Sequence, residues 1–330
     1  MNRRRSVRAL LALAVASTAA WAQPAAKPAR ITYLVWGPAP NPPGPKNPFL
    51  DAFQEGLRAL GYSEGRDVVV EVRWTMGNAG EQARLGDAFA ALKTDVIVAT
   101  GETSGRAAQQ ATTTIPIVLA YSADPVAGGF AKSLARPGGN ITGIATLNED
   151  LSGKMLELLL DLLPKRSRLA VLGNPGVPSY ASVLKSLQEA ARAGGVNILS
   201  IEARSAGEIE SGFARMAKER VSGVVVLGDP LIFAQRRQIA ELASKQRIAS
   251  VYPAKEHVDA GGLMSYGVDI KDGFRRAATY VDKILKGAKP GELPIEQART
   301  LELAINLKTA KDLGIKFPQS ILVRADQVVE

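Results

Sequence analysis

The sequence has no cysteine and only one histidine, and these two absences remove most catalytic chemistry. Its 330 residues offer no thiol for a disulfide, a thiolate nucleophile or a thiolate metal site. His257, in the stretch Glu256-His257-Val258-Asp259, has no cysteine to pair with, and one histidine cannot build the usual zinc ligand sets. The G-x-S-x-G elbow that would present a catalytic serine is also missing. We interpret His257 as a surface residue and expect no enzyme, no metal and no cofactor.

Phosphate-binding loops are absent as well. The proline-rich segment 37–44 lacks the Lys-Ser/Thr ending of a P-loop. The glycines of Pro137–Gly143 precede an apolar run, whereas a dinucleotide fingerprint follows a strand. We therefore interpret this segment as a helix stop and a turn.

The N-terminus has the pattern of a secretory signal. Arg3, Arg4, Arg5 and Arg8 precede the apolar stretch Ala9–Ala20, and Ala20-Trp21-Ala22 has the small-x-small form of a cleavage site. The stretch is too short to span a bilayer, so we expect cleavage after Ala22 and release into the periplasm without a lipid-anchor cysteine. A disordered basic tail is the alternative, and a twin-arginine signal fits the residues after the arginines poorly.

The positive charge comes partly from this segment. Removing residues 1–22 takes away four arginines and no acid, so the formal net charge falls from +9 to +5. The remaining basic residues stand in scattered pairs such as Lys165-Arg166 and Arg236-Arg237, which are typical of solvated helix faces. We expect no nucleic-acid partner.

The rest of the chain alternates apolar β-rich runs with helical patterns, and it does so twice. The first half predicts strands at Ile31–Trp36, Val68–Trp74, Val96–Ala99, Ile117–Ala120 and Ile141–Ala145, with helices near Asn47–Leu60, Glu81–Leu92, Ser104–Thr112 and Val126–Leu134. The second half predicts a helix ending at Pro164 and strands at Leu169–Gly173, Val196–Ile201, Val224–Leu227 and Ser250–Tyr252. This alternation predicts βαβ units and parallel sheets, and two sheets of four or five strands suit usual sheet sizes better than one of about ten.

Later segments predict several passages between the two halves. Leu263–Gly267 is predicted as a strand, Phe274–Lys286 as a helix, and Thr300–Asn306 and Ile321–Val323 as extended pieces. We expect a first lobe of residues 23–147 and about 268–300, and a second lobe of residues 148–267 and about 301–330. Several crossing segments make a hinge, because each can absorb part of a closing rotation.

Polar residues follow the predicted strands in both halves. Asp124-Pro125 and Asp229-Pro230 each place a carboxylate between a strand and a predicted helix, where it caps the helix or, across a cleft, suits a ligand ammonium group. The segment Gly101–Ser104 starts a predicted helix whose free N–H groups suit a carboxylate, with Thr103 and Ser104 as hydroxyl donors. Other strand-end residues that we predict to line a binding cleft, by packing or by stacking on a ligand, are Trp36, Tyr121, Ser122, Asn174, Tyr180, Tyr252 and Tyr266.

With these residues in place, the chain resembles the substrate-binding proteins of ABC transporters, in the group described as binding tryptophan or aromatic amino acids. The resemblance covers nearly all of the mature chain. Its landmarks are Ala52-Phe53 to Gly61-Tyr62, Thr114–Val118, Asp124–Val126, Ser133–Gly143, Gly261–Gly267, Ile284–Pro290 and Arg324–Asp326. The chain departs from the usual pattern in its proline-rich segment 38–48 and at Ala298, where a proline is common.

The resemblance implies a type I periplasmic-binding fold with two lobes and a cleft that closes when ligand binds. It implies no enzymatic activity. We expect a monomeric receptor that captures a small ligand, an amino acid or similar zwitterion, and delivers it to ABC permease subunits in the inner membrane. A periplasmic sensor module for a membrane signalling partner is the alternative. A regulator of the lactose-repressor kind would need an N-terminal helix-turn-helix in place of the signal segment.

Overall fold

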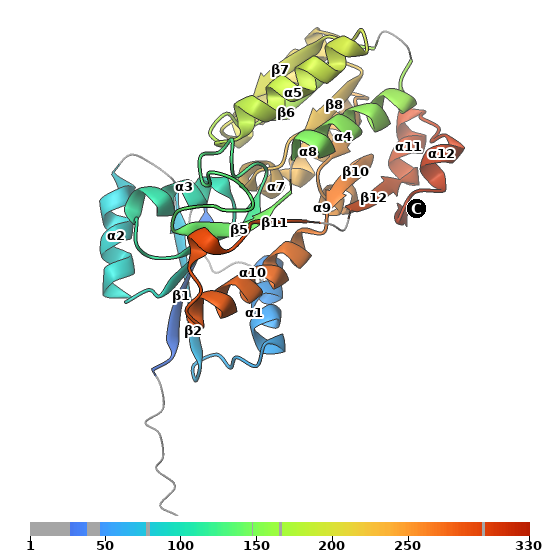
Figure 1. Cartoon of the computed structure of the whole chain (residues 1–330). Coiled ribbons are helices and arrows are strands. Elements are labelled where there is room, and N and C mark those ends of the chain that lie inside the picture. The colour runs from blue at the N-terminus through green and yellow to red at the C-terminus, as the bar shows by residue number, and fades with distance from the viewer. Residues whose placement is uncertain (1–26, 38–46, 77–79, 147, 165–166, 299–300) are drawn as a thin grey trace, which may run out of the picture.

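The computed structural model describes residues 27–37, 47–76, 80–146, 148–164, 167–298 and 301–330. The predicted signal segment, residues 1–22, lies outside these ranges. Within them the chain forms two separate β-sheets of six and seven strands, each covered by helices on both faces (Figure 1). We call the six-stranded sheet with its helices the first lobe and the seven-stranded sheet with its helices the second lobe.

The first lobe has the strand order β11-β5-β4-β3-β1-β2, and its strands are parallel. Its strands are β1 (Ala29–Trp36), β2 (Val68–Thr75), β3 (Val96–Ala99), β4 (Ile117–Ser122), β5 (Ile141–Ala145) and β11 (Glu296–Gln297). Its helices are α1 (Pro48–Ala59), α2 (Glu81–Ala91), α3 (Glu102–Ala111), α10 (Ile270–Leu285) and the short 3-10 helix η1 (Pro290–Glu292).

The second lobe has the strand order β13-β12-β10-β9-β8-β6-β7, in which only the β10–β12 pair is antiparallel. Its strands are β6 (Leu169–Gly173), β7 (Ile198–Glu202), β8 (Gly223–Val226), β9 (Ala249–Tyr252), β10 (Met264–Val268), β12 (Leu301–Asn306) and β13 (Gln327–Val329). Its helices are α4 (Asn148–Leu162), α5 (Tyr180–Ala193), α6 (Ala206–Lys218), α7 (Pro230–Ala234), α8 (Arg236–Lys245), α9 (Lys255–Asp259), α11 (Leu307–Leu313) and α12 (Gln319–Leu322).

Alternation along the buried strands explains why helices cover both faces. In β6, Leu169 and Val171 pack into the cluster beneath α4 and α5, whereas Ala170 and Leu172 pack into the cluster beneath α6 and α8. Successive side chains of a strand point to opposite faces, so a continuous apolar run must be buried twice. The same continuous pattern in β3 divides the first lobe between the α1–α10 face and the α2–α3 face.

Three details of the sequence-based prediction are wrong. Val126–Leu134 forms turns and bends rather than a helix, although Asp124 Oδ1 does accept the N–H groups of Val126 and Ala127 at 2.9 Å. Gly129 takes a positive φ of 69° and Phe130 turns into the core, so the chain cannot continue as a helix. Ile321–Val323 is not extended, since α12 ends at Leu322. The sheets also exceed five strands, because β11, β12 and β13 join them late in the chain.

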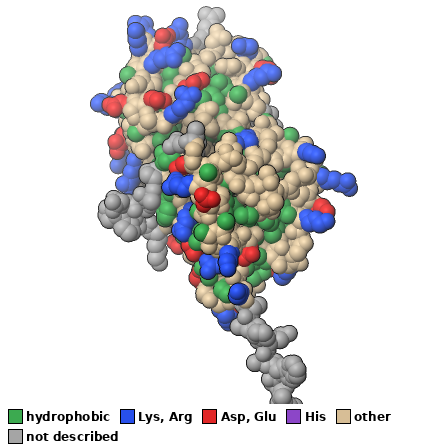
Figure 2. Space-filling view, turned by 90° about the vertical axis from the view of Figure 1, so that its left-hand side faces the viewer, with side chains coloured by type: hydrophobic (Ala, Val, Ile, Leu, Met, Phe, Trp, Pro, Cys, Tyr) green, Lys and Arg blue, Asp and Glu red, His purple; other side chains and the backbone are tan. Residues whose placement is uncertain are grey.

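The chain crosses between the two lobes at several points. After β5 in the first sheet the chain enters α4, after β10 in the second sheet it enters α10, and between β11 and β12 it returns to the second sheet. Helix α10 packs on α1 and against β4, which places it in the first lobe. The turned view shows lysine and arginine side chains interspersed with acidic ones on that face of the molecule rather than gathered in a stripe (Figure 2).

Candidate functional site: the cleft between the lobes

The lobes meet at the carboxyl ends of their parallel strands, which is where open α/β sheets bind ligands. Three close approaches mark the meeting. The rings of Phe49 in α1 and Phe233 in α7 lie 5.1 Å apart between centroids. A Cβ added at Gly101 would lie 3.7 Å from Pro230 Cγ, and one added at Gly228 would lie 3.0 Å from the hydroxyl oxygen of Tyr121. The cleft is therefore closed in this structure.

Asp229 is the buried carboxylate of the second lobe at this edge. It follows β8 by three residues and caps α7. Its Oδ1 accepts the N–H of Ile232 at 2.6 Å, and its Oδ2 accepts a hydrogen bond from the side-chain amide of Asn174. Burial raises the pKa of Asp229 to about 6, and the hydrogen bonds from Ile232 and Asn174 oppose that rise. A buried acid with an elevated pKa is a group that gains from a cationic partner.

Asn174 follows β6, and both the oxygen and the nitrogen of its side-chain amide form hydrogen bonds. Its Oδ1 accepts the N–H of Gly176 at 2.8 Å, and its Nδ2 donates to Asp229. The predicted pair Asn174 and Asp229 thus forms one polar cluster at neighbouring strand ends, opposite Gly101 of the first lobe.

The segment Gly101–Ser104 begins α3 as predicted, but its polar side chains differ in availability. Ser104 is fully buried, and its hydroxyl accepts the N–H of Gly101 and donates to the carbonyl of Gly101. Thr103 is half-buried, and its side chain makes no hydrogen bond with the described residues. Thr103 is the second residue of α3, and the first N–H groups of a helix have no carbonyl partner within it.

Tyr121, Ser122 and Asp124 lie in the first lobe where β4 ends. Tyr121 reaches toward Gly228 of the second lobe, as described above. Ser122 and Asp124 instead face a buried carboxylate, because the hydroxyl of Ser122 and the N–H of Asp124 both donate to Glu102 Oε1, at 2.8 and 3.0 Å.

The predicted aromatic residues do not gather in the cleft. Trp36, at the end of β1, packs across the cleft against the second-lobe cluster that contains Leu231 and Ile232. Tyr180, the first residue of α5, lines a small hollow in the cleft, while its hydroxyl lies 3.1 Å from Ser200 Oγ. Tyr252 is fully buried in the second-lobe core, and Tyr266 packs beside the cluster beneath α4 and α5. Of the predicted aromatic residues, Trp36, Tyr121 and Tyr180 lie at the cleft.

His257 is buried rather than on the surface, so our interpretation of this residue is wrong. Its ring stacks on Tyr252 with centroids 4.9 Å apart, and Nδ1 lies 3.2 Å from the carbonyl of Ala254. Burial lowers the pKa of His257 to about 4, so the ring is neutral at physiological pH. It serves as a core residue of α9, because an apolar environment of rings tolerates the neutral imidazole.

Sequence reasoning missed two pairs of residues that join the lobes. Phe49 and Phe233 meet in the cleft, and the Glu102 carboxylate accepts the N–H of Ser179 at 3.0 Å. The two residues of the first pair are 184 positions apart in the chain and those of the second pair 77, so no local sequence pattern connects them. An acid at the first position of α3 is typical of helix starts and gave no separate signal.

The hollow that remains in the cleft is small. It is lined by Ala123 of the first lobe and by seven residues of the second, among them Asn174, Ser179 and Tyr180, and its volume is about 20 Å³. A volume of about 10–15 Å³ on this measure holds one water molecule. An amino acid does not fit in this hollow.

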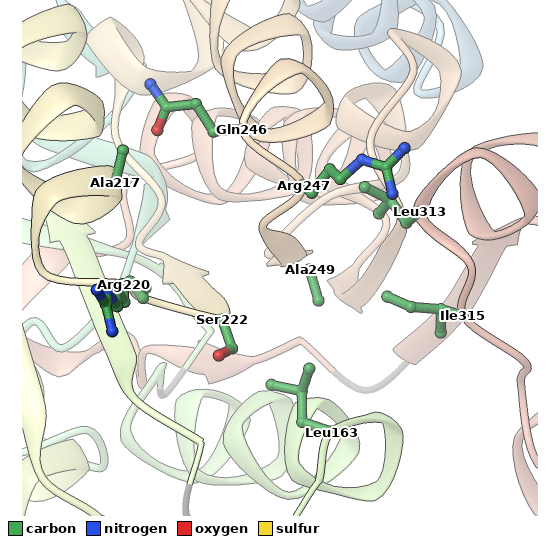
Figure 3. Close-up of a pocket in the computed structure, with 10 residues that line it drawn as sticks. Leu163, Ala217, Arg220, Ser222, Gln246, Arg247, Ala249, Leu313 and Ile315 are labelled. Atoms are coloured by element: carbon green, nitrogen blue, oxygen red, sulfur yellow. The ribbon is translucent and has the colours of Figure 1, made fainter.

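A roomier cavity of about 460 Å³ lies at the other end of the second lobe (Figure 3). Ser222 and Ala249 line it at the amino ends of β8 and β9, and Leu163, Leu313 and Ile315 contribute apolar walls. Because ligands of parallel sheets bind at the carboxyl ends, the cleft and not this cavity is the candidate site.

The described residues offer no group of three or more His, Asp and Glu side chains that could hold a metal ion. Among the helices that the structure describes, none combines the length and apolar character needed to cross a bilayer. Two α/β lobes joined by several chain crossings, with polar groups at facing strand ends, define a bilobed solute-binding protein of the type I periplasmic kind.

The comparisons agree with this class. The family model for ABC transporter substrate binding proteins matches residues 47–329, and the chain belongs to this family, whose members bind solutes and are not enzymes. The tyrosine-binding protein of Clostridioides difficile (strain R20291) is 26% identical over 276 residues, which are 82% of this chain and 79% of that protein.

Two crystal structures share the whole architecture. An ABC domain in complex with L-Trp from Streptococcus pneumonia superposes with a TM-score of 0.82 at 25% identity, over 92% of this chain and 100% of that one. A conserved domain protein from Vibrio cholerae also gives a TM-score of 0.82, at 27% identity, with the same coverage.

Proposed function

We propose that this protein is the exported receptor of an ABC importer and that it captures an aromatic amino acid in the cleft between its lobes. The observation that carries the proposal is the polar cluster of Asn174 and Asp229, which faces the start of α3 across the cleft. The relatives described as a tyrosine-binding protein and as a complex with L-Trp support an aromatic side chain for the ligand.

The two charged ends of an amino acid have different partners in this cleft. The ammonium group binds Asp229, a buried acid that otherwise keeps its charge at a cost. The carboxylate binds the first turn of α3, where Thr103 supplies a hydroxyl and the helix N-terminus supplies N–H groups and a favourable field. The aromatic part stacks against Trp36 or Tyr121 at the cleft wall.

The family of the chain supports the proposed delivery to permease subunits. Export is supported by the signal pattern of residues 1–22, and we propose cleavage after Ala22 and a monomeric mature protein.

The test is a thermal-shift screen of the twenty amino acids followed by titration calorimetry of those that stabilise the protein. L-Tyr or L-Trp should raise the melting temperature and bind with a defined stoichiometry of one. Small-angle scattering should then give a smaller radius of gyration with ligand if unliganded molecules open in solution. The absence of binding by every aromatic amino acid contradicts the ligand proposal.

A further inference from the structure

Glu102 is a buried carboxylate whose two oxygens serve different lobes. It is the first residue of α3 and only 4% exposed. Oε1 accepts two donors of its own lobe, the Ser122 hydroxyl and the Asp124 N–H. Oε2 accepts one donor of the second lobe, the N–H of Ser179, at 3.0 Å.

The second-lobe donor lies at the start of a long helix. Ser179 directly precedes α5, which has 14 residues, so Oε2 lies at the positive end of that helix. A hydrogen bond to an ionised acceptor is stronger than one between neutral groups, and burial strengthens it further. The Phe49–Phe233 contact is apolar and tolerates sliding, whereas this bond has a defined direction.

We propose that Glu102 is a latch that stabilises the closed arrangement of the two lobes. When the lobes part, Oε2 loses the Ser179 N–H and must be solvated, while Oε1 keeps both first-lobe donors. The bond exists only in the closed state and therefore shifts the equilibrium toward that state. The consequence for ligand affinity rests on the proposed receptor function, but the latch itself does not.

Glu102→Gln tests the latch with almost no change of shape. The two first-lobe donors orient the amide so that its oxygen replaces Oε1, which leaves the amide nitrogen facing the Ser179 N–H. Two donors then oppose each other in the closed state alone. We expect about a tenfold or larger shift of the unliganded protein toward open molecules.

Glu81→Gln is the control. One oxygen of the Glu81 carboxylate accepts the Thr75 hydroxyl and the Met76 N–H, and the other pairs with Arg84, and these three residues all lie in its own lobe. The same chemical change there should leave the lobe equilibrium as in the wild type.

The measurement is the distance between spin labels on Asp87→Cys in α2 and Ala181→Cys in α5, both exposed and in different lobes. The absence of native cysteine means that only these two sites react. In the unliganded protein, Glu102→Gln should broaden the distribution or move it to longer distances. A distribution that coincides with that of the wild type and of Glu81→Gln overturns the latch.

Titration with L-Tyr and L-Trp separates the latch from the receptor proposal. Glu102→Gln should bind whichever of the two the wild type binds about tenfold more weakly, because closure becomes less favourable. If the wild type binds neither, the receptor proposal fails while the unliganded distances still decide the latch. Should Glu102→Gln fail to fold, Glu102→Asp keeps the charge but shortens the reach, and it should open the unliganded protein in the same assay.

Discussion

Asn174 donates its side-chain amide to Asp229 across the carboxyl ends of the neighbouring strands β6 and β8. The same carboxylate caps α7 through the N–H of Ile232. One acid thus holds a helix start and a strand-end amide together at the point where the second lobe faces the first. A structural cap and a ligand partner are both consistent with this position, and a single substitution separates them.

Asp229→Asn should weaken ligand binding and preserve the fold. Asparagine caps helices about as well as aspartate, so α7 should remain, while the hydrogen bond from the Asn174 amide is lost because a second amide nitrogen then faces it. Removing one side of a buried charge pair costs about 2–5 kcal/mol, which corresponds to at least about thirtyfold weaker binding of the amino acid by calorimetry. Asp124→Asn is the control and should bind as the wild type does, because the half-buried Asp124 carboxylate already caps the turn after β4 through the N–H groups of Val126 and Ala127. Unchanged affinity in Asp229→Asn would leave this residue as a cap only.

Ligand affinity should fall as the pH drops below about 6. The free protein holds Asp229 with a pKa raised to about 6 by burial, and a bound ammonium group lowers it. Binding below pH 6 therefore releases a proton, and affinity should decline by about tenfold per pH unit there. Calorimetry between pH 4.5 and 7.5 checks this, and the residual binding of Asp229→Asn should vary much less over that range.

His257 should make the fold less stable in mild acid. Its folded pKa, lowered by burial to about 4, lies below the unfolded value of about 6.5, so the unfolded chain binds the proton first. The stability is fully present above pH 6.5 and is lost as the pH falls toward 4, by about 3 kcal/mol at most.

Asp229 has the opposite effect over nearly the same range. Its folded pKa is raised, so its contribution is present at low pH and is lost as the pH rises through about 6. The two effects partly cancel in the wild type. Denaturant unfolding of Asp229→Asn at several pH values should show the full effect of His257 on how the free energy of unfolding varies with pH. Adding His257→Phe should make that free energy nearly independent of pH over this range. A pH dependence of the free energy of unfolding that persists in the double variant would show that other groups cause it.

Gly267→Ala should strongly destabilise the protein. A Cβ at Gly267, in β10 just before the crossing to α10, would lie 1.8 Å from the carbonyl oxygen of Pro253. The backbone would have to move, at a cost of about 1–3 kcal/mol or more. Gly153→Ala is the control: a Cβ there meets nothing within 4 Å, and removing a helix glycine should gain about 0.5–1 kcal/mol. Urea unfolding of both variants gives the comparison.

The mature protein should begin at Gln23. Expression of the full chain in a Gram-negative host, followed by N-terminal sequencing of the periplasmic fraction, tests the predicted cleavage after Ala22. Ala22→Leu should block processing, because the peptidase requires a small residue at that position. Uncleaved wild-type protein retained in the cytoplasm would refute the prediction.

Much of the architecture follows from patterns a few residues long. Continuous apolar runs such as Leu169–Gly173 are buried on both sides only inside a sheet that helices cover on both faces. They therefore predicted parallel sheets and the edge at which their strands end. Asp229-Pro230 indicated a helix start because its capping chemistry is local. Asp124-Pro125 had the same local signal, yet Gly129 and the burial of Phe130 turned the chain into a loop.

What lies between the lobes was decided by tertiary structure alone. His257 became a core residue because the rings of Tyr252 and Phe233 enclose it. Glu102 and Ser179 became partners because two separate sheets face each other, and no periodicity encodes that geometry. Secondary structure depends on neighbours three or four residues away, which a sequence displays, whereas a cleft depends on how two finished surfaces meet.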